Sequence, residues 1–209
     1  MFFSFLNGSN FHKGIEALES KDIEKATIFF KKSAINGNIE GYFELGKIFY
    51  KKKDLTNAMK YFKLASDYNH LKARYNMAII YGNKNYKEHS FKDSYKLFLD
   101  LAQRGNSKAQ NKVGLFLLYG WGVDKDYKLA VQWFENAYFK RGYKPAVCNL
   151  AFMFANGYGV FANFGRASVL AKIGMKEGYS KCKSIYKEFK LHKYPKDKSF
   201  KFGYYKNLL

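Results

Sequence analysis

The feature that most constrains this chain is a segment that occurs twice. "YGWGVDKDYKLAVQWFENA", residues 119–137, matches "GYGVFANFGRASVLAKIGMKEG", which starts at Gly157, at an offset of 37 residues. Seven coincident positions at one offset indicate an internal repeat, and a repeat of this length indicates stacked supersecondary units. The matched pairs are Gly120/Gly157, Gly122/Gly159, Val123/Val160, Asp126/Asn163, Ala130/Ala167, Trp133/Leu170 and Ala137/Gly174.

The second half of the repeat can be followed through the chain by three positions. A small residue is followed by a large one three positions later and by another, generally small, residue four positions after that. Spacings of three and four place side chains on one face of a helix, so each set predicts a buried helix face. At steps of 32, 36, 36 and 37 the sets are Ala26/Phe29/Ser33, Ala58/Tyr61/Ala65, Ser94/Leu97/Leu101, Ala130/Trp133/Ala137 and Ala167/Leu170/Gly174.

A first helix with its own signature precedes each of the last four sets. Glycine in a helix interior costs about 1 kcal/mol relative to alanine, so a repeated small residue needs a geometric reason. Close approach of two helices supplies it, and we expect the rings of Tyr61 and Trp133 to lie over the small residue of the neighbouring helix. The signatures are Gly41/Leu45/Gly46/Phe49, Ala73/Met77/Ala78/Tyr81, Ala109/Val113/Gly114/Leu117 and Ala146/Leu150/Ala151/Phe154; the first unit keeps Gly14 and Ala17.

Read from Ala109 to Ala137, the pattern is A-x-x-x-[LVM]-[GA]-x-x-[YFL], Gly-x-Gly-Val-x-x-Asp and A-x-x-W-x-x-x-A. It resembles the Sel1-like repeat, a relative of the tetratricopeptide repeat. The resemblance covers about residues 11–183 and is strongest in the last two units. The first two units have the shorter corners "LESKD" and "YKKKD", which are equally similar to tetratricopeptide repeats. The third has "NKNYKEHSF" in place of the glycine motif, which predicts a corner of different shape.

The resemblance implies an all-α fold, an α-solenoid of antiparallel helix pairs in a right-handed superhelix whose concave face is lined by first helices. Units of this size bury their apolar face only by stacking on neighbours, which favours the same architecture. Ile185 and Phe189 are spaced to cover the last unit as a capping helix. The expected organisation is an N-terminal segment 1–10, repeats 11–40, 41–72, 73–108, 109–145 and 146–183 within 11–183, and a cap with a basic aromatic tail over 184–209.

The glycine loop at Gly120 and Gly122 has two possible roles. Glycines before a helix can cradle a phosphate, but that loop follows a strand and is singular, whereas this one follows a helix and is repeated. We therefore interpret it as the corner between two helices, with Asp126 at the start of the second, where a carboxylate stabilises the free N–H groups. The predicted structural positions are Gly46, Ala78, Gly114, Gly120, Gly122, Asp126, Ala130, Trp133, Ala137, Ala151, Gly157, Gly159 and Ala167.

Cysteine and histidine usage predicts no metal site and no cofactor. Cys148 and Cys182 are too few for a disulfide scaffold, and we interpret them as buried or free thiols in a reducing compartment. The histidines are scattered without metal-ligand spacing. "MFFSFLNGSN" lacks the basic start of a signal peptide, and no apolar run is long enough to span a membrane, so a cytoplasmic location is expected.

The search for catalytic motifs favours a non-enzymatic chain. Some cysteine-rich Sel1-like proteins are described as β-lactamases, and the resemblance includes "AVCNLA" around Cys148, but Tyr138 stands where the partner thiol of those proteins would fall. Ser-x-x-Lys occurs at Ser180/Lys183 and Ser184/Lys187, about as often as chance predicts for this composition, without the accompanying Lys-Thr-Gly or Ser-Asp-Asn. A β-lactamase-like hydrolase is therefore only a distant alternative.

Charge is the outlier in the composition. The chain has 37 Lys+Arg against 17 Asp+Glu, and residues 71–209 hold 26 of the basic and 9 of the acidic side chains. Such a field attracts anionic partners, namely nucleic acid, an anionic membrane surface or an acidic protein. Codon usage is the alternative explanation, because the excess is mostly Lys, and Asn, Phe and Tyr, which also have A/T-rich codons, are abundant too.

The concave face is the expected ligand surface. Amide, phenol and ammonium groups on the first helices suit a peptide backbone or a terminal carboxylate, and an ordinary solvated face is the alternative. The candidates are Glu44, Lys47, Tyr75, Asn76, Asn111, Lys112, Asn149 and Asn156.

Two functions remain open. The first is a non-catalytic scaffold or adaptor that binds a peptide or acidic segment of a protein partner. The second is binding to nucleic acid or an anionic membrane surface through the basic half, where Phe200, Phe202, Tyr204 and Tyr205 could stack or insert.

Overall fold

The computed structural model describes residues 2–195 and 197, with side chains from residue 9 onward. This part of the chain is built from α-helices, with one π-helical and one 3-10 stretch and no β-strand. The helices are α1 (Phe2–Glu19), α2 (Ile23–Ile35), α3 (Ile39–Lys51), α4 (Leu55–Asp67), α5 (Leu71–Tyr81), α6 (Phe91–Gln103), α7 (Ser107–Tyr119), α8 (Tyr127–Glu135), α9 (Ala146–Asn156), α10 (Phe164–Lys176) and α11 (Ser180–Glu188).

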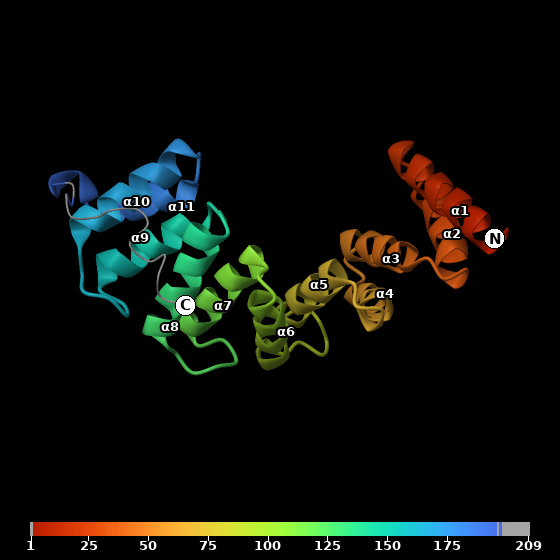
Figure 1. Cartoon of the computed structure of the whole chain (residues 1–209), viewed down its shortest axis with the longest axis horizontal. Helices are drawn as coiled ribbons and strands as arrows, with labels where there is room; N and C mark the ends of the chain where they lie inside the picture. The colour runs from red at the N-terminus through yellow and green to blue at the C-terminus, as the bar shows by residue number, and fades with distance from the viewer. Residues whose placement is uncertain (1, 196, 198–209) are drawn as a thin grey trace. The chain divides into compact units, whose positions relative to one another are not determined.

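The chain forms two compact units, Met1–Leu97 and Phe98–Leu209, whose boundary falls within α6. From α1 to α5 and from α7 to α11, each helix packs on the helix that follows it, and α9 also contacts α11 (Figure 1). This succession of helix pairs confirms the all-α solenoid expected from the sequence. The first helix starts at Phe2, upstream of residue 11, and the capping helix starts at Ser180, upstream of residue 184.

Four of the second helices begin at an acid or amide that caps them. In each case a side-chain oxygen accepts a hydrogen bond from the backbone N–H three residues on, which satisfies a donor that has no partner inside the helix. The caps are Asp22 on α2, Asp54 on α4, Asp126 on α8 and Asn163 on α10.

The aromatic ring that covers each small residue is one position later than expected. A Cβ atom at Gly46 would lie 2.5 Å from the Phe62 ring, and one at Gly114 would lie 2.6 Å from the Phe134 ring. Both rings are fully buried, whereas Tyr61 and Trp133 are only half-buried. The assignment of Tyr61 and Trp133 to this contact was therefore wrong: helix α4 or α8 presents the residue four positions after its first alanine, which is the next one around the helix.

The glycine motif forms the corner between helices, as predicted. Gly120 and Gly157 end α7 and α9 in the left-handed conformation, and their N–H groups bond to the carbonyls of Phe116 and Met153. A Cβ at Gly159 would overlap the backbone of Tyr127, so this glycine allows one corner to pack on the start of α8.

Trp121 partly shields the first of these corners. Its ring stacks on Tyr119 at 4.8 Å and meets the edge of Phe116 at 5.7 Å, which leaves 39% of the residue exposed.

The third corner, between α5 and α6, has the different shape that its sequence predicted. Tyr86 turns inward, is buried, and meets the Tyr81 ring edge-on. Ser94, the small residue of α6, donates a hydrogen bond of 2.6 Å to the Ala78 carbonyl, so a polar contact replaces an apolar one here.

The chain after α10 forms a cap. Ile185 of α11 and Leu191 of the 3-10 turn Leu191–Lys193 are buried, and the Phe189 ring meets Phe152 edge-on at 6.4 Å. The tail aromatics Phe200, Phe202, Tyr204 and Tyr205 lie outside the described residues.

Helix α8 ends at Glu135 and continues into the π-helical stretch Asn136–Lys140. Burial of the Glu135 carboxyl raises its pKa from 4.5 to about 7, and the nearby Arg166 guanidinium offsets only part of this shift. The folded protein therefore retains a proton on Glu135 at pH values where the unfolded chain has lost it.

We expect Phe134→Ala to lower the free energy of unfolding by about 3–5 kcal/mol, because it empties the space over Gly114. Trp133→Phe should change it little, since the Trp133 indole N–H is buried and makes no hydrogen bond within the described structure. Urea denaturation followed by circular dichroism measures both. Equal losses for the two variants would contradict the assignment.

The free energy of unfolding should fall as the pH rises from about 4.5 to about 7, since the folded state binds the Glu135 proton more tightly than the unfolded chain does. Glu135→Gln should remove this slope and make the protein more stable than wild type above pH 7. Urea titrations at several pH values test this. Glu177→Gln, which breaks an exposed ion pair with Lys144, is the matched control and should leave the slope in place.

Candidate functional site

The ligand candidates on α3, Glu44 and Lys47, form an ion pair. The Lys47 ammonium contacts both carboxylate oxygens of Glu44, at 2.6 and 2.7 Å, and lies 5.5 Å from the centre of the Phe43 ring. Glu44 is 8% exposed, and the Lys47 ammonium balances the charge of its buried carboxylate. This pair is a closed contact and offers little to a ligand.

Tyr75 and Asn76 lie on α5 and are half-buried. Their helix begins at His70, whose ring accepts a hydrogen bond from the Ala73 N–H and contacts Glu40 of α3 at 3.0 Å. The candidates of α3 and α5 are thus held on neighbouring first helices of one unit.

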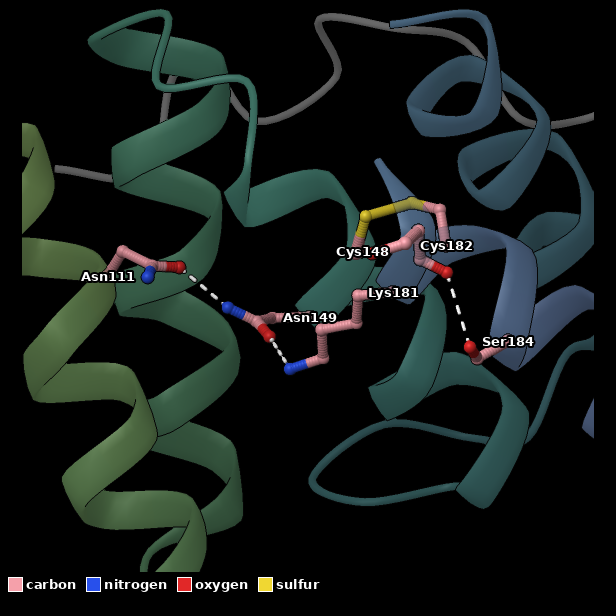
Figure 2. The surroundings of a disulfide bond; sticks show 7 residues. Asn111, Cys148, Asn149, Lys181, Cys182 and Ser184 are labelled. Atoms are coloured by element: carbon pink, nitrogen blue, oxygen red, sulfur yellow. Dashed lines mark hydrogen bonds between the residues drawn. A yellow bond between two sulfur atoms is a disulfide. The ribbon is translucent and has the colours of Figure 1, made fainter. Parts of the chain in front are cut away.

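Two candidates of the second unit, Asn111 and Asn149, form part of a chain of polar contacts across successive first helices. Asn149 of α9 donates a hydrogen bond of 2.6 Å to Asn111 of α7, and its carbonyl oxygen accepts one from the Lys181 ammonium of α11. Figure 2 shows Asn149 between its two partners. We refer to Asn111, Asn149 and Lys181 as the amide ladder.

Both amides of the ladder are almost fully buried. Asn111 is 8% exposed and Asn149 is 4% exposed. A buried amide without partners is costly, so the two side chains hold each other in fixed orientations. The position of the Asn149 side chain is therefore set by partners on both sides.

The ends of the ladder are hydrogen-bond donors. Within the described residues, the side-chain N–H₂ group of Asn111 makes no hydrogen bond, and Lys181 uses one of the three donors of its ammonium. A ligand on this surface would have to supply acceptors. Carbonyl oxygens of an extended peptide and carboxylates meet that requirement.

Burial also affects the lysines of this region. It lowers the pKa of both Lys181 and Lys112 below the usual lysine value, because packing around an ammonium removes water that would stabilise its charge. A carboxylate placed next to such an ammonium restores the lost stabilisation. The electrostatics therefore favour an anionic ligand group.

Asn156 does not join the ladder. Its amide donates a hydrogen bond of 2.9 Å to the Phe152 carbonyl of the same helix. It thereby bonds to a carbonyl near the C-terminal end of α9 and takes no part in the ladder.

Lys181 was missed by the sequence analysis because residues 180–183 were assigned to the end of the fifth repeat. They form the start of α11, which takes the place of a first helix of a further unit. A signal was present: Gly174 ends the fifth set of inward positions, so the next helix had to be a first helix.

The prediction for the cysteines was wrong. Cys148 of α9 and Cys182 of α11 are buried, as expected, but they form a disulfide, with Cα atoms 4.8 Å apart. Sequence separation gave no indication, because first helices of adjacent units lie side by side only once the solenoid forms. A disulfide is typical of oxidising compartments, so these cysteines no longer support a reducing one.

The remaining candidate chemistry is sparse in the described part of the chain. The Ser184 hydroxyl donates to the Ser180 carbonyl, at 3.2 Å on the exposed side of α11. Residues 2–195 and 197 contain no cluster of three or more histidine, cysteine or acidic groups able to hold a metal. In the same residues no helix has the length and apolar character of a membrane span.

Solved structures with the same fold include a Sel1 repeat protein from Oxalobacter formigenes. It is 25% identical, has a TM-score of 0.73, and the match covers 83% of this chain and 72% of that protein. A protective antigen of uropathogenic Escherichia coli with an SLR fold is 22% identical, with a TM-score of 0.69 over 88% of this chain and 45% of that one.

Among curated proteins, Protein sel-1 homolog 2 from Mus musculus and from Homo sapiens is 30% identical over 115 residues. The match spans 53% of this chain but only 17% of those relatives. The Sel1 repeat profile matches residues 8–38, 40–70, 107–138 and 144–167, more than half of the chain. The chain belongs to the Sel1 repeat family.

Proposed function

We propose that this protein is a non-catalytic interaction scaffold whose second unit binds an extended, acidic segment of a protein partner along the amide ladder. Sel1 repeat solenoids commonly act as scaffolds for protein–protein interaction. The observation that carries the finer proposal is the hydrogen-bonded row Asn111–Asn149–Lys181 on three successive first helices.

The ladder suits a peptide because its groups are fixed before the ligand arrives. The two buried amides lose little side-chain freedom on binding, and such preorganisation lowers the entropic cost of association. An extended peptide presents carbonyl oxygens at regular intervals, which can accept from Asn111 at one end of the row.

In this proposal, Lys181 is the residue that makes the ladder prefer acidic segments. Its ammonium is partly desolvated and lies at the C-terminal end of the row, so a ligand carboxylate would gain both a charge pair and a hydrogen bond there. The excess of basic side chains over residues 71–209 would speed the approach of such a segment.

Lys181→Gln should reduce affinity for a captured acidic partner by about tenfold, since it removes one charge-assisted hydrogen bond. Lys183→Gln is the matched control, because Lys183 is exposed on the same helix and changes the net charge equally. Partners are captured from native lysate at about 0.1 and 0.3 M salt and identified by mass spectrometry, and affinities for the identified segment are then measured by anisotropy.

Three outcomes are decisive. Proteins held at about 0.3 M salt by wild type and Lys183→Gln, but not by Lys181→Gln, support the proposal. Equal loss with both variants assigns binding to net charge alone and contradicts it. Capture of generic RNA or anionic vesicles that disappears at the higher salt favours the nucleic-acid or membrane-surface function instead.

A further inference from the structure

The disulfide and the ladder are built on adjacent residues of the same two helices. Cys148 precedes Asn149 on α9, and Lys181 precedes Cys182 on α11. The covalent bond and the hydrogen bond therefore join the same pair of helices one residue apart, as Figure 2 shows. Any movement of α11 that breaks one strains the other.

We propose that the Cys148–Cys182 disulfide positions Lys181 in the amide ladder, so that the oxidised protein presents the complete ladder and a dithiol reductant opens it. The consequence for ligand binding rests on the proposed function of the ladder. The structural coupling itself does not require a ligand.

Apart from the disulfide, α11 is held by its packing on α9 and α10, in which Ile185 is buried. It is nine residues long, and helices of this length are marginal without tertiary support. Within it, Cys182 and Ile185 are the buried side chains. Lys181 as a whole residue is exposed, and its ammonium is held in the ladder by the hydrogen bond to Asn149, which depends on where α11 lies.

The fold makes room for this bond. A Cβ atom at Gly174 of α10 would overlap the Cys182 sulfur and come within 3.0 Å of Val147. Glycine at this position thus leaves the space that the disulfide occupies between α9, α10 and α11. Both cysteines are at most 1% exposed, so a reductant reaches the sulfurs only when α11 opens locally.

The redox step is an ordinary thiol–disulfide exchange. The S–S bond breaks, Cys148 and Cys182 each gain one hydrogen, and the dithiol reductant loses two hydrogens and closes to its own disulfide. With the covalent bond gone, α11 opens more often and Lys181 leaves Asn149. The reduced protein then keeps the Asn111–Asn149 contact without the adjoining cation.

Hydrogen–deuterium exchange of the full chain tests the coupling without any ligand. We compare the oxidised protein, the same protein in dithiothreitol, and the Cys148→Ser/Cys182→Ser double variant. Backbone amides of residues 184–188 should exchange about tenfold or more faster after reduction or substitution, while those of α7 stay unchanged. Faster exchange in α7 as well would mean general unfolding and would contradict an opening confined to α11.

A second readout distinguishes positioning from mere stabilisation. The lysine amine pKa values are measured by NMR in both redox states, with Lys183 as the control. On reduction, the pKa of Lys181 should rise toward the usual lysine value, because its ammonium regains water. An unchanged Lys181 pKa, or unchanged exchange in α11, overturns the proposal.

Binding is scored separately with a short fluorescein-labelled peptide of alternating Glu and Ala. Weaker binding by the reduced protein, together with the changes above, would show that the disulfide also controls the affinity for a ligand. If neither form binds the peptide but α11 still changes on reduction, the result counts against the proposed function and supports the coupling between the disulfide and Lys181.

Discussion

The contact on which the helix pairs depend is an aromatic ring placed over a glycine. Phe62 lies over Gly46 and Phe134 over Gly114, with no room for even one additional carbon. Because a buried ring removes a large apolar area from water, this contact stabilises the pair, and because the glycine has no side chain, the helices approach closely. The spacing between the two helices follows from that approach, and the positions of the first-helix side chains follow from the spacing.

Most of the fold could be predicted because it repeats. The period, the helix pairs, the corners at Gly120 and Gly157 and the cap at Asp126 all follow from local patterns that recur. The ring over the glycine was misassigned by one position, since Trp133 and Phe134 are both large and apolar and only the helix rotation distinguishes them. Such a rotation is set by tertiary packing, which a pattern of neighbouring large residues does not encode.

The candidate site was predicted in part. Asn111 and Asn149 were selected as first-helix side chains, and the structure brings them together, whereas Asn156 bonds to its own helix and Glu44 pairs with Lys47. Lys181 and the disulfide were missed for one reason. Both require α11 to lie beside α9, and α11 resembles a terminal cap in sequence, so its residues were not compared with those of the first helices.

Helix α11 both covers the apolar end of the last repeat and supplies the Lys181 ammonium, and it does so with neighbouring residues. Cys182 and Ile185, three residues apart, form the buried stripe that closes the apolar end of the solenoid. Lys181 precedes Cys182 and lies four residues before Ile185, so it is at the edge of that stripe, where its long side chain can reach Asn149 while much of it stays in water. A cap must be polar outside and apolar inside, and its boundary is where a charged group can be held close to the protein interior. The edge of the buried stripe is thus a place where a partly desolvated ammonium can be held, and there the cap supplies a cation to the ladder.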